Sequence, residues 1–289
     1  MVAVPLYFLQ NDAMTRWLCL LFALGLLRPA LAQTDAKTNT PKPGERSIIQ
    51  FQQSPPQTEA EQIKLRFHSV ENPGAYDVTK ESFEILVPKN YQPSVPHGLF
   101  VWISANNDTK IPKDWDAVLA EKKLIFIAAK NSGNPRNSFD RFRMAVDANV
   151  NLRALYNVDG RRVYVSGFSG GSRVASMLGV AFGEMFSGAL CFMGVNFYTD
   201  TQGTDGKTYR LDYIPDDDVL AMAKKYCRYA FITGGKDFNR PNTYGVLENG
   251  FKKEAFANAK VFDIPDQGHS PPAADWLKKA LEYLDEGKK

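Results

Sequence analysis

The sequence predicts an α/β protein with a mostly parallel sheet of about eight strands and helices on both faces. Near-continuous apolar strands alternate with helical segments from Glu61 onward, a pattern typical of strands buried on both sides. In addition, residues 163–182, VYVSGFSGGSRVASMLGVAF, are expected to form a strand, a tight turn and a helix in direct succession. The chain of 289 residues is long enough to bury a core of this size.

Each expected strand is a short run of β-branched, aromatic or other apolar residues bounded by turn-forming residues. The expected strands cover residues 63–68, 83–87, 99–104, 124–129, 163–166, 189–193, 229–233 and 261–264. The expected helices cover residues 115–122, 139–156, 172–182, 216–226, 245–257 and 273–283. The longest of these helices repeats apolar residues near a period of 3.6, from Phe142 to Leu155.

The beginning of the chain has the pattern of a secretory leader. Met14 and Arg16 precede eleven largely apolar residues, and the segment ends in Ala30-Leu31-Ala32. This order predicts a signal peptide over residues 1–32 that is cut after Ala32, with Met14 as a candidate true start. Eleven apolar residues are too few to span a bilayer, so no stable membrane anchor is expected. The chain is therefore predicted to be secreted or periplasmic.

The remainder divides into a tether and one domain. Residues 33–60 are rich in Pro, Gln and Thr, which predicts a flexible tether in which residues 47–51 could form an edge strand. Residues 61–289 are expected to fold as a single domain. The formal net charge is only +3 and no basic cluster is interleaved with aromatic residues, so nucleic acid is not an expected partner.

Two cysteines, Cys191 and Cys227, remain once the leader is removed. In an oxidising compartment they could form one disulfide, and two separate buried thiols are an equal alternative because spacing does not establish geometry. Neither cysteine lies in a Cys-x-x-Cys or Cys/His motif, so redox catalysis and a zinc site are not expected. No metal or organic cofactor is implied.

Ser169 lies at the centre of a G-x-S-x-G motif between a strand and a helix. Such a turn holds the serine in a strained conformation, with its hydroxyl projecting from the sheet edge. Side chains at Gly167 and Gly171 would collide with the neighbouring strand and helix, which explains the glycines. The motif therefore predicts a nucleophile, and the alternative is a glycine-rich turn with a structural serine.

Asp237 and His269 also follow the ends of expected strands. The carboxyl ends of parallel strands share one edge of a sheet, so both side chains are expected beside Ser169, in the chain order Ser, Asp, His. A serine hydroxyl becomes a good nucleophile when an imidazole takes its proton, and a carboxylate orients that imidazole. Asp200, beyond the strand 189–193, is the main rival for the acid.

The other two histidines are expected to be structural or surface residues. His97 precedes the strand 99–104 and so belongs to the opposite, amino end of the sheet. His68 lies within an expected strand. Position along the strands therefore separates His269 from both of them.

Acyl transfer also requires hydrogen-bond donors for a developing oxyanion. The first expected donor is the backbone amide of Gly170. The second is the amide of Ser104 or Ala105, in the loop after the strand 99–104. That loop could equally be an ordinary surface turn.

A long segment, residues 196–215, contains Phe197, Tyr198, Tyr209 and Tyr213 among polar turn residues. It could form a small lid over the site, or it could be an ordinary surface loop. As a lid, its aromatic side chains would suit an apolar or aromatic acyl group.

The motifs GFSGG, TGGKD and QGHS, in this order and spacing, resemble those of the α/β-hydrolase superfamily, and the resemblance covers residues 62–285. Within it, the chain is most similar to secreted esterases of the polyhydroxybutyrate-depolymerase and feruloyl-esterase type. The resemblance implies the α/β-hydrolase fold, with Ser169 as nucleophile, Asp237 as acid and His269 as base. It also implies a small-molecule or polymer ester as substrate.

The leading hypothesis is a secreted serine hydrolase that cleaves carboxylic esters through an acyl-enzyme. A peptidase or an acyltransferase of the same fold is one alternative. The other is a non-catalytic binding protein that retains the fold, against which the intact Ser, Asp, His order argues. The sequence gives no indication of the oligomeric state.

Overall fold

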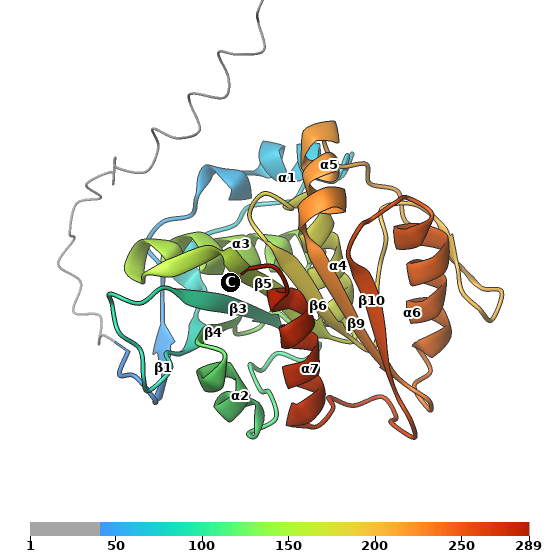
Figure 1. Ribbon diagram of the computed structural model, residues 1–289. Coiled ribbons are helices and arrows are strands. Elements are labelled where there is room, and N and C mark those ends of the chain that lie inside the picture. Colours follow the sequence, from blue (N-terminus) through green and yellow to red (C-terminus); the bar gives the residue numbers. More distant parts are fainter. Residues whose placement is uncertain (1–40, 289) are drawn as a thin grey trace, which may run out of the picture. The chain divides into compact units, whose positions relative to one another are not determined.

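A computed structural model describes residues 41–288, which form one central sheet covered by helices (Figure 1). The sheet strands are β1 (Arg46–Ile49), β2 (Phe83–Leu86), β3 (His97–Ile103), β4 (Leu124–Ala129), β5 (Val158–Phe168), β6 (Gly188–Phe192), β9 (Arg228–Gly234) and β10 (Ala259–Ile264). Their order across the sheet is β1-β2-β4-β3-β5-β6-β9-β10. All neighbours from β4 to β10 are parallel, and β2 pairs antiparallel with both β1 and β4. The expected mostly parallel sheet is confirmed.

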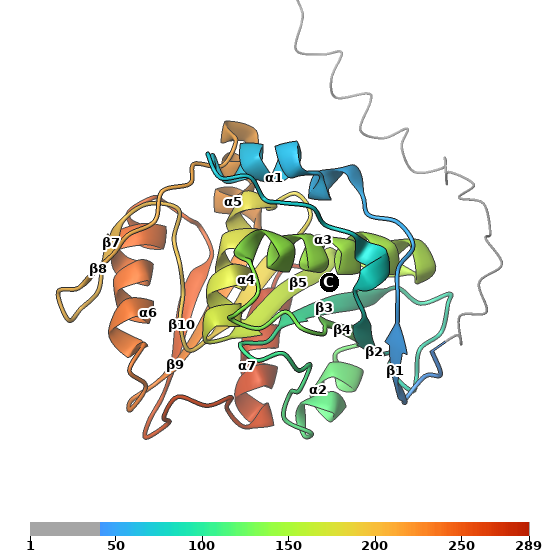
Figure 2. The same cartoon turned by 180° about the vertical axis from the view of Figure 1, so that it is seen from behind.

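Helices cover both faces of this sheet. They are α1 (Ala60–Arg66), α2 (Trp115–Glu121), α3 (Ser138–Leu155), α4 (Gly170–Ala181), α5 (Asp217–Tyr226), α6 (Arg240–Val246) and α7 (Ala274–Asp285). Short turns at Pro56–Thr58 and Val78–Lys80 and a π-helix at Leu247–Lys252 complete the helical elements. Figures 1 and 2 show α2 and α7 on one face and α1, α3, α4 and α5 on the other.

The alternation of side chains along β3 explains the two layers. Leu99 and Val101 belong to the core that includes α3 and α4, whereas Phe100 and Trp102 belong to the core that includes α2 and α7. Successive residues of a strand point to opposite faces, so an all-apolar strand supplies both cores. The sheet is thereby fixed from both sides, and the ends of its strands are rigid supports for a site.

The expected strand 63–68 is wrong, because this segment is the helix α1 followed by a turn. Ile63 and Phe67 lie four residues apart and are both buried in the core, while the residues between them are polar or partly exposed. Spacing by four is the period of a helix face, and Glu, Gln, Lys and Arg are good helix formers. His68 has a positive φ of 45° and is not in a strand.

The folded domain begins earlier than residue 61. β1 lies within the expected tether 33–60 and pairs with β2, as the possible edge strand at 47–51 anticipated. Phe51 and Thr58, from the same segment, are also buried. The expected leader over residues 1–32, its cut after Ala32 and the start at Met14 lie outside the described residues.

The expected helix 245–257 also differs from the structure. α6 begins at Arg240, with Pro241 in its first turn, where a missing N–H costs no hydrogen bond. It ends at Val246, and the π-helix Leu247–Lys252 continues from it. The apolar residues predicted helical structure correctly here, but not where it starts.

Cys191 and Cys227 are separate, buried thiols, so the alternative of a disulfide between them is wrong. Cys191 of β6 pairs in register with Phe231 of β9, and Cys227 lies four residues before Phe231. Four residues of strand span about 13 Å, and a disulfide requires Cα atoms about 6 Å apart. Burial raises the pKa of both thiols to about 12, so they stay protonated at neutral pH.

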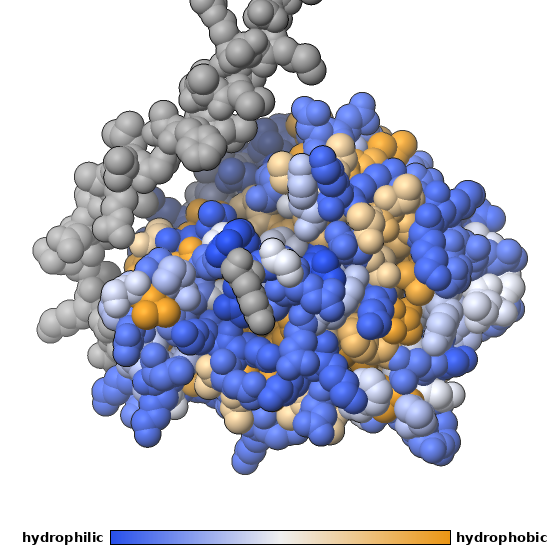
Figure 3. Space-filling model, viewed as in Figure 1, coloured by the Kyte–Doolittle hydropathy of each residue, from blue (hydrophilic) through white to orange (hydrophobic). Residues whose placement is uncertain are grey.

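None of the helices in residues 41–288 combines the length and the apolar character needed to cross a membrane. Figure 3 shows a largely hydrophilic face with apolar side chains gathered over the edge strand β10. Several side chains of β10 are only half-buried, in agreement with its place at the edge of the sheet.

Candidate active site

Ser169 forms the sharp turn between β5 and α4. Its backbone has φ 54° and ψ −116°, a conformation that non-glycine residues rarely adopt. The turn is held by two hydrogen bonds, from the Ser169 N–H to the Phe192 carbonyl at 2.8 Å and from the Arg173 N–H to the Ser169 carbonyl at 3.1 Å. A strained residue fixed by surrounding contacts is typical of a functional site.

The expected steric need for glycine beside Ser169 is confirmed. A Cβ on Gly167 would lie 2.4 Å from the Gly171 carbonyl carbon and 2.7 Å from the Ile103 oxygen. A Cβ on Gly171 would lie 2.0 Å from that same Ile103 oxygen. β5, α4 and the end of β3 therefore meet with no room for a side chain between them.

The substitution Gly167→Ala is expected to destabilise the fold by about 3 kcal/mol, because the new methyl group meets backbone that cannot move aside. Gly160→Ala, on the same strand, is the matched control, since its nearest contact is the end of the Arg153 side chain at 3.5 Å. We expect this control to change stability by less than about 0.5 kcal/mol. Urea unfolding of both variants measures the difference. Equal stabilities would contradict the steric argument.

His269 lies in the loop between β10 and α7, with its ring between Ser169 and Asp237. Its Nδ1 is 2.7 Å from Asp237 Oδ1, and its Nε2 is 2.9 Å from Ser169 Oγ. A carboxylate only accepts hydrogen bonds, so Nδ1 carries a proton and Nε2 of the neutral ring accepts one from the serine hydroxyl. The three side chains form one continuous hydrogen-bonded chain.

Asp237 follows β9 and has a buried carboxylate with several donors. Oδ2 accepts from the Thr233 hydroxyl at 3.0 Å, and Oδ1 accepts from the Asn239 N–H at 3.1 Å as well as from His269. These bonds fix the orientation of the carboxylate. The Asp237 carboxylate is therefore held in a fixed orientation toward His269.

The loop that carries Asp237 and the loop that carries His269 are joined by backbone hydrogen bonds. The Lys236 N–H donates to the Gln267 carbonyl at 2.9 Å, and the Gly235 N–H donates to the Ile264 carbonyl at 2.9 Å. A Cβ on Gly234 would lie 2.2 Å from that Gln267 oxygen, so only glycine permits the approach. This backbone pairing sets the distance between Asp237 and His269.

The rival residues lie in other surroundings. Asp200 is exposed, and its Oδ1 accepts from the Leu211 N–H at 2.9 Å, which closes a loop. His97 is the first residue of β3, where it is fully buried and its Nδ1 lies 2.9 Å from the Val95 carbonyl oxygen. His68 follows α1. None of them joins the hydrogen-bonded chain of Ser169, His269 and Asp237.

The residues expected to supply the oxyanion donors lie at the same edge of the sheet as Ser169. Gly170 begins α4, so its N–H is among those that have no acceptor within the helix. Ala105 accepts a bond from the Asn134 N–H at 2.9 Å, and within residues 41–288 its own N–H has no hydrogen-bond partner. Ile103 pairs in register with Gly167, which brings the Ser104–Ala105 peptide to the same edge. The roles of Gly170, Ser104 and Ala105 as donors stay predictions.

The chain resembles known proteins in its three-dimensional structure but matches none of those compared by sequence. No family model matches the chain, and no curated protein matches it. S-formylglutathione hydrolase from Staphylococcus aureus superposes with a TM-score of 0.55 at 10% identity, over 83% of this chain and 99% of that one. The feruloyl esterase module from Clostridium thermocellum gives 0.53 at 14%, over 84% and 89%. Esterase 2 from Thermogutta terrifontis gives 0.51 at 16%, over 75% and 92%.

These three solved structures share the arrangement of the sheet over at least three quarters of this chain. The chain has the α/β-hydrolase fold. The fold implied by GFSGG, TGGKD and QGHS is thus confirmed. In this α/β-hydrolase fold, the three residues of the hydrogen-bonded chain follow β5, β9 and β10 at the carboxyl edge of the sheet.

Two aromatic residues beside His269 were not expected from the sequence. The Phe168 ring lies 4.9 Å and the Phe238 ring 4.1 Å from the imidazole, measured between ring centroids. Phe238 is 70% exposed. The sequence does show a phenylalanine directly after Asp237, but it does not show whether that ring points to the site or into the core.

Arg173 is a further residue that sequence reasoning missed. Its guanidinium donates to Asn196 Oδ1 at 2.9 Å and to Asn239 Oδ1 at 3.1 Å, and it lies 5.7 Å from the Tyr209 ring centroid. Burial lowers its pKa. Arg173 therefore connects the start of the segment 196–215 to the loop that carries Asp237.

The segment 196–215 contributes less aromatic surface than expected. Phe197, Tyr198 and Tyr213 are buried in the main core, and only Tyr209 is partly exposed. Thr201–Gln202 and Thr208–Tyr209 pair as a two-stranded hairpin, β7 and β8. Three of the four aromatic residues thus anchor the segment to the core.

No group of His, Cys, Asp and Glu side chains in residues 41–288 is arranged to hold a metal ion. The expectation that no metal or cofactor is needed stays a prediction.

Proposed function

We propose that the protein is a serine hydrolase that cleaves carboxylic esters through an acyl-enzyme. The observation that carries the proposal is the continuous hydrogen-bonded chain from Ser169 Oγ through His269 to Asp237. Solved proteins of the same fold support the ester class, since two of those compared are named esterases and the third an S-formylglutathione hydrolase. Attribution to the polyhydroxybutyrate-depolymerase and feruloyl-esterase type rests on the motifs.

In the first half of the reaction, Ser169 Oγ attacks the ester carbonyl carbon while its proton moves to His269 Nε2. Asp237 stabilises the imidazolium that forms, since its carboxylate already faces Nδ1 at 2.7 Å. The carbonyl oxygen becomes an oxyanion, for which the N–H groups of Gly170 and Ala105 are the proposed donors.

In the second half, His269 gives its proton to the departing alcohol oxygen, and the ester bond breaks to leave acyl-Ser169. A water molecule then transfers a proton to Nε2 and attacks the acyl carbon. Collapse of this second tetrahedral species releases the acid and returns the proton to the serine. Replacement of water by another alcohol gives the acyltransferase alternative.

The substrate carries an apolar or aromatic group. Phe238 is an exposed ring against the imidazole, so a substrate near His269 meets an apolar surface. Covering such a ring removes apolar area from water and favours binding. Both small and polymeric esters remain candidates, because the ring does not set the length of the substrate.

The substitution Phe238→Ala is expected to lower kcat/KM about tenfold for p-nitrophenyl decanoate, because it removes an apolar contact worth about 1.4 kcal/mol. The loss should be smaller for the acetate ester, which has little apolar area to bury. Tyr226→Ala is the matched control, since Tyr226 is also exposed but lies on α5. Equal losses for Tyr226→Ala and Phe238→Ala would count against a substrate contact.

The experiment that tests the proposed function treats the protein with a fluorophosphonate and locates the label by mass spectrometry. An activated serine is expected to be labelled at Ser169. Hydrolysis of p-nitrophenyl acetate to decanoate, compared with peptide amides, then separates esterase from peptidase. Absence of both labelling and turnover would support a non-catalytic binding protein instead.

Export of the protein is also proposed, on the basis of the leader pattern in residues 14–32. Cleavage after Ala32 would give a mature chain that begins at Gln33.

A further inference from the structure

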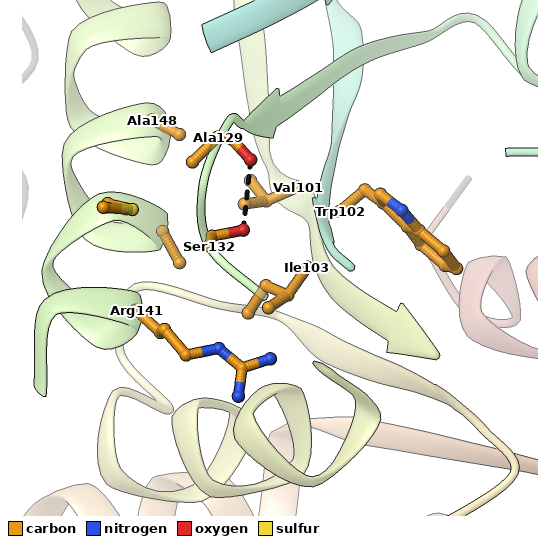
Figure 4. Close-up of a pocket in the computed structure, with 9 residues that line it drawn as sticks. Val101, Trp102, Ile103, Ala129, Ser132, Arg141 and Ala148 are labelled. Atoms are coloured by element: carbon orange, nitrogen blue, oxygen red, sulfur yellow. Dashed lines mark hydrogen bonds between the residues drawn. The ribbon is translucent and has the colours of Figure 1, made fainter. Parts of the chain in front are cut away.

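Arg141 is a buried cation whose side chain has one hydrogen-bond acceptor within residues 41–288. It lies in the first turn of α3, is 4% exposed, and donates from Nη2 to the Ser104 carbonyl at 3.0 Å. Its Nε has no hydrogen-bond partner, and no carboxylate in residues 41–288 lies within ion-pair distance. Figure 4 shows its side chain extending from α3 beside Ile103, the last residue of β3.

This placement is costly. Burying a guanidinium without a counterion removes its hydration, and burial lowers the pKa of Arg141 to about 10. A cation in the first turn of a helix also lies at the positive end of the helix dipole. An uncharged side chain would fill the same space, so packing alone does not explain why position 141 carries a positive charge.

The Ser104 carbonyl belongs to the same peptide unit as the Ala105 N–H. In a trans peptide these two groups point in opposite directions, so a bond on the carbonyl fixes the direction of the N–H. A cation on the carbonyl oxygen also polarises the unit and makes its N–H a stronger donor. The Ala105 N–H has no partner within the described chain and lies at the same edge as Ser169.

The same loop is fixed from its other side. The Asn106 N–H donates to Ser104 Oγ at 3.0 Å, and the Asn134 N–H donates to the Ala105 carbonyl at 2.9 Å. The peptide between Ser104 and Ala105 is thus held at its flanks by neutral bonds and at its carbonyl by a cation.

We propose that Arg141 is a positioning residue for the oxyanion hole: its guanidinium orients and polarises the Ser104–Ala105 peptide so that the Ala105 N–H stabilises the tetrahedral oxyanion. The inference rests on the proposed serine hydrolase function and adds a residue on the far side of the reacting backbone. Because the oxyanion exists only in the transition state and intermediates, Arg141 acts on kcat rather than on substrate binding.

The test compares Arg141→Met with Arg143→Met. Arg143 is a matched control on the same helix, 2% exposed, which donates to the backbone carbonyls of Thr58 at 2.9 Å and Gly74 at 3.1 Å. Both variants lose a buried cation that binds carbonyl groups, but only Arg141 contacts the Ser104–Ala105 peptide. Active sites are counted by fluorophosphonate labelling, so that kcat refers to folded enzyme.

We expect Arg141→Met to lower kcat about tenfold to hundredfold with little change in KM, since loss of a whole oxyanion donor costs about 10²- to 10³-fold. Arg141→Lys, which keeps a cation in reach of the carbonyl, should recover most of this loss. Arg143→Met should keep the wild-type kcat. In an acyl-enzyme made with a cinnamoyl ester, the acyl C=O stretch should move to higher wavenumber in Arg141→Met alone.

A wild-type kcat and an unchanged C=O stretch in folded Arg141→Met would overturn the role of Arg141 while leaving the hydrolase proposal intact. Wild-type enzyme that neither turns over esters nor labels with fluorophosphonate would overturn both. If Arg141→Met does not fold, Arg141→Gln carries the same test, because it keeps a donor and loses the charge.

Discussion

Replacing Ser169 by alanine is expected to lower kcat for ester hydrolysis about a million-fold, the scale of loss when a catalytic serine is removed. His269 Nε2 then has no hydroxyl to activate, although it stays beside Asp237. Without the hydroxyl there is no acyl-enzyme, so only weak hydrolysis by water at the oxyanion donors is left. The measurement is the initial rate with p-nitrophenyl acetate, with the fold checked by circular dichroism.

Ser176→Ala is the matched control for this variant. Ser176 lies two turns further along α4, and its hydroxyl donates to the Arg173 carbonyl at 2.9 Å. It takes no part in the chain of hydrogen bonds to His269, so its kcat should stay within about threefold of wild type. Turnover by Ser169→Ala comparable to that of Ser176→Ala would exclude Ser169 as the nucleophile.

The position of the candidate site was predictable because strand ends are local features of the sequence. Ser169, Asp237 and His269 each follow an apolar run, and a parallel sheet brings the carboxyl ends of such runs together. Neither the pairing of strands nor the hydrogen bonds had to be known for that step. The structure adds the distances, and it separates Asp237, which contacts His269, from Asp200, which closes a loop.

The residues that sequence reasoning missed depend on tertiary packing. Arg141 lies 28 residues before Ser169 in a helix whose sequence gives no sign that one of its arginines reaches the Ser104 carbonyl. Phe238 could equally have pointed into the core. The prediction of a strand at residues 63–68 was wrong for a different reason. A short run that contains Ile63 and Phe67 fits either a strand or one face of a helix until the burial of its residues is known.

Whether Cys191 and Cys227 form a disulfide depends on the register of the two strands, which only the structure gives. Cys191 and Cys227 lie on or beside neighbouring strands, which made a disulfide plausible. In parallel strands, however, the offset along the chain direction decides the distance, and the sequence does not give that offset. The fold class is thus predictable from patterning, whereas contacts between elements require the pairing itself.

Asp237→Asn is expected to lower kcat about 10⁴-fold, the second largest effect of a single substitution at this site. An amide at this position can turn its NH₂ toward His269 Nδ1, which then becomes an acceptor. The ring proton moves to Nε2, and Nε2 can no longer take the proton of Ser169. The carboxamide has nearly the same shape, and its oxygen still accepts from the Thr233 hydroxyl, so the fold is retained although the NH₂ in place of Oδ1 no longer accepts from the Asn239 N–H.

Asp200→Asn is the control, because it makes the same chemical change at the rival acid. Asp200 Oδ1 accepts from the Leu211 N–H at 2.9 Å, a bond that an asparagine carbonyl oxygen can also accept, so kcat should stay near the wild-type value. The two variants are compared by kcat and by the rate of labelling with a fluorophosphonate, which reports activation of the serine directly. A large loss in Asp200→Asn together with an active Asp237→Asn would transfer the acid role to Asp200. That outcome would also require the segment 196–215 to move toward His269, since in the structure it is Asp237 that contacts the imidazole.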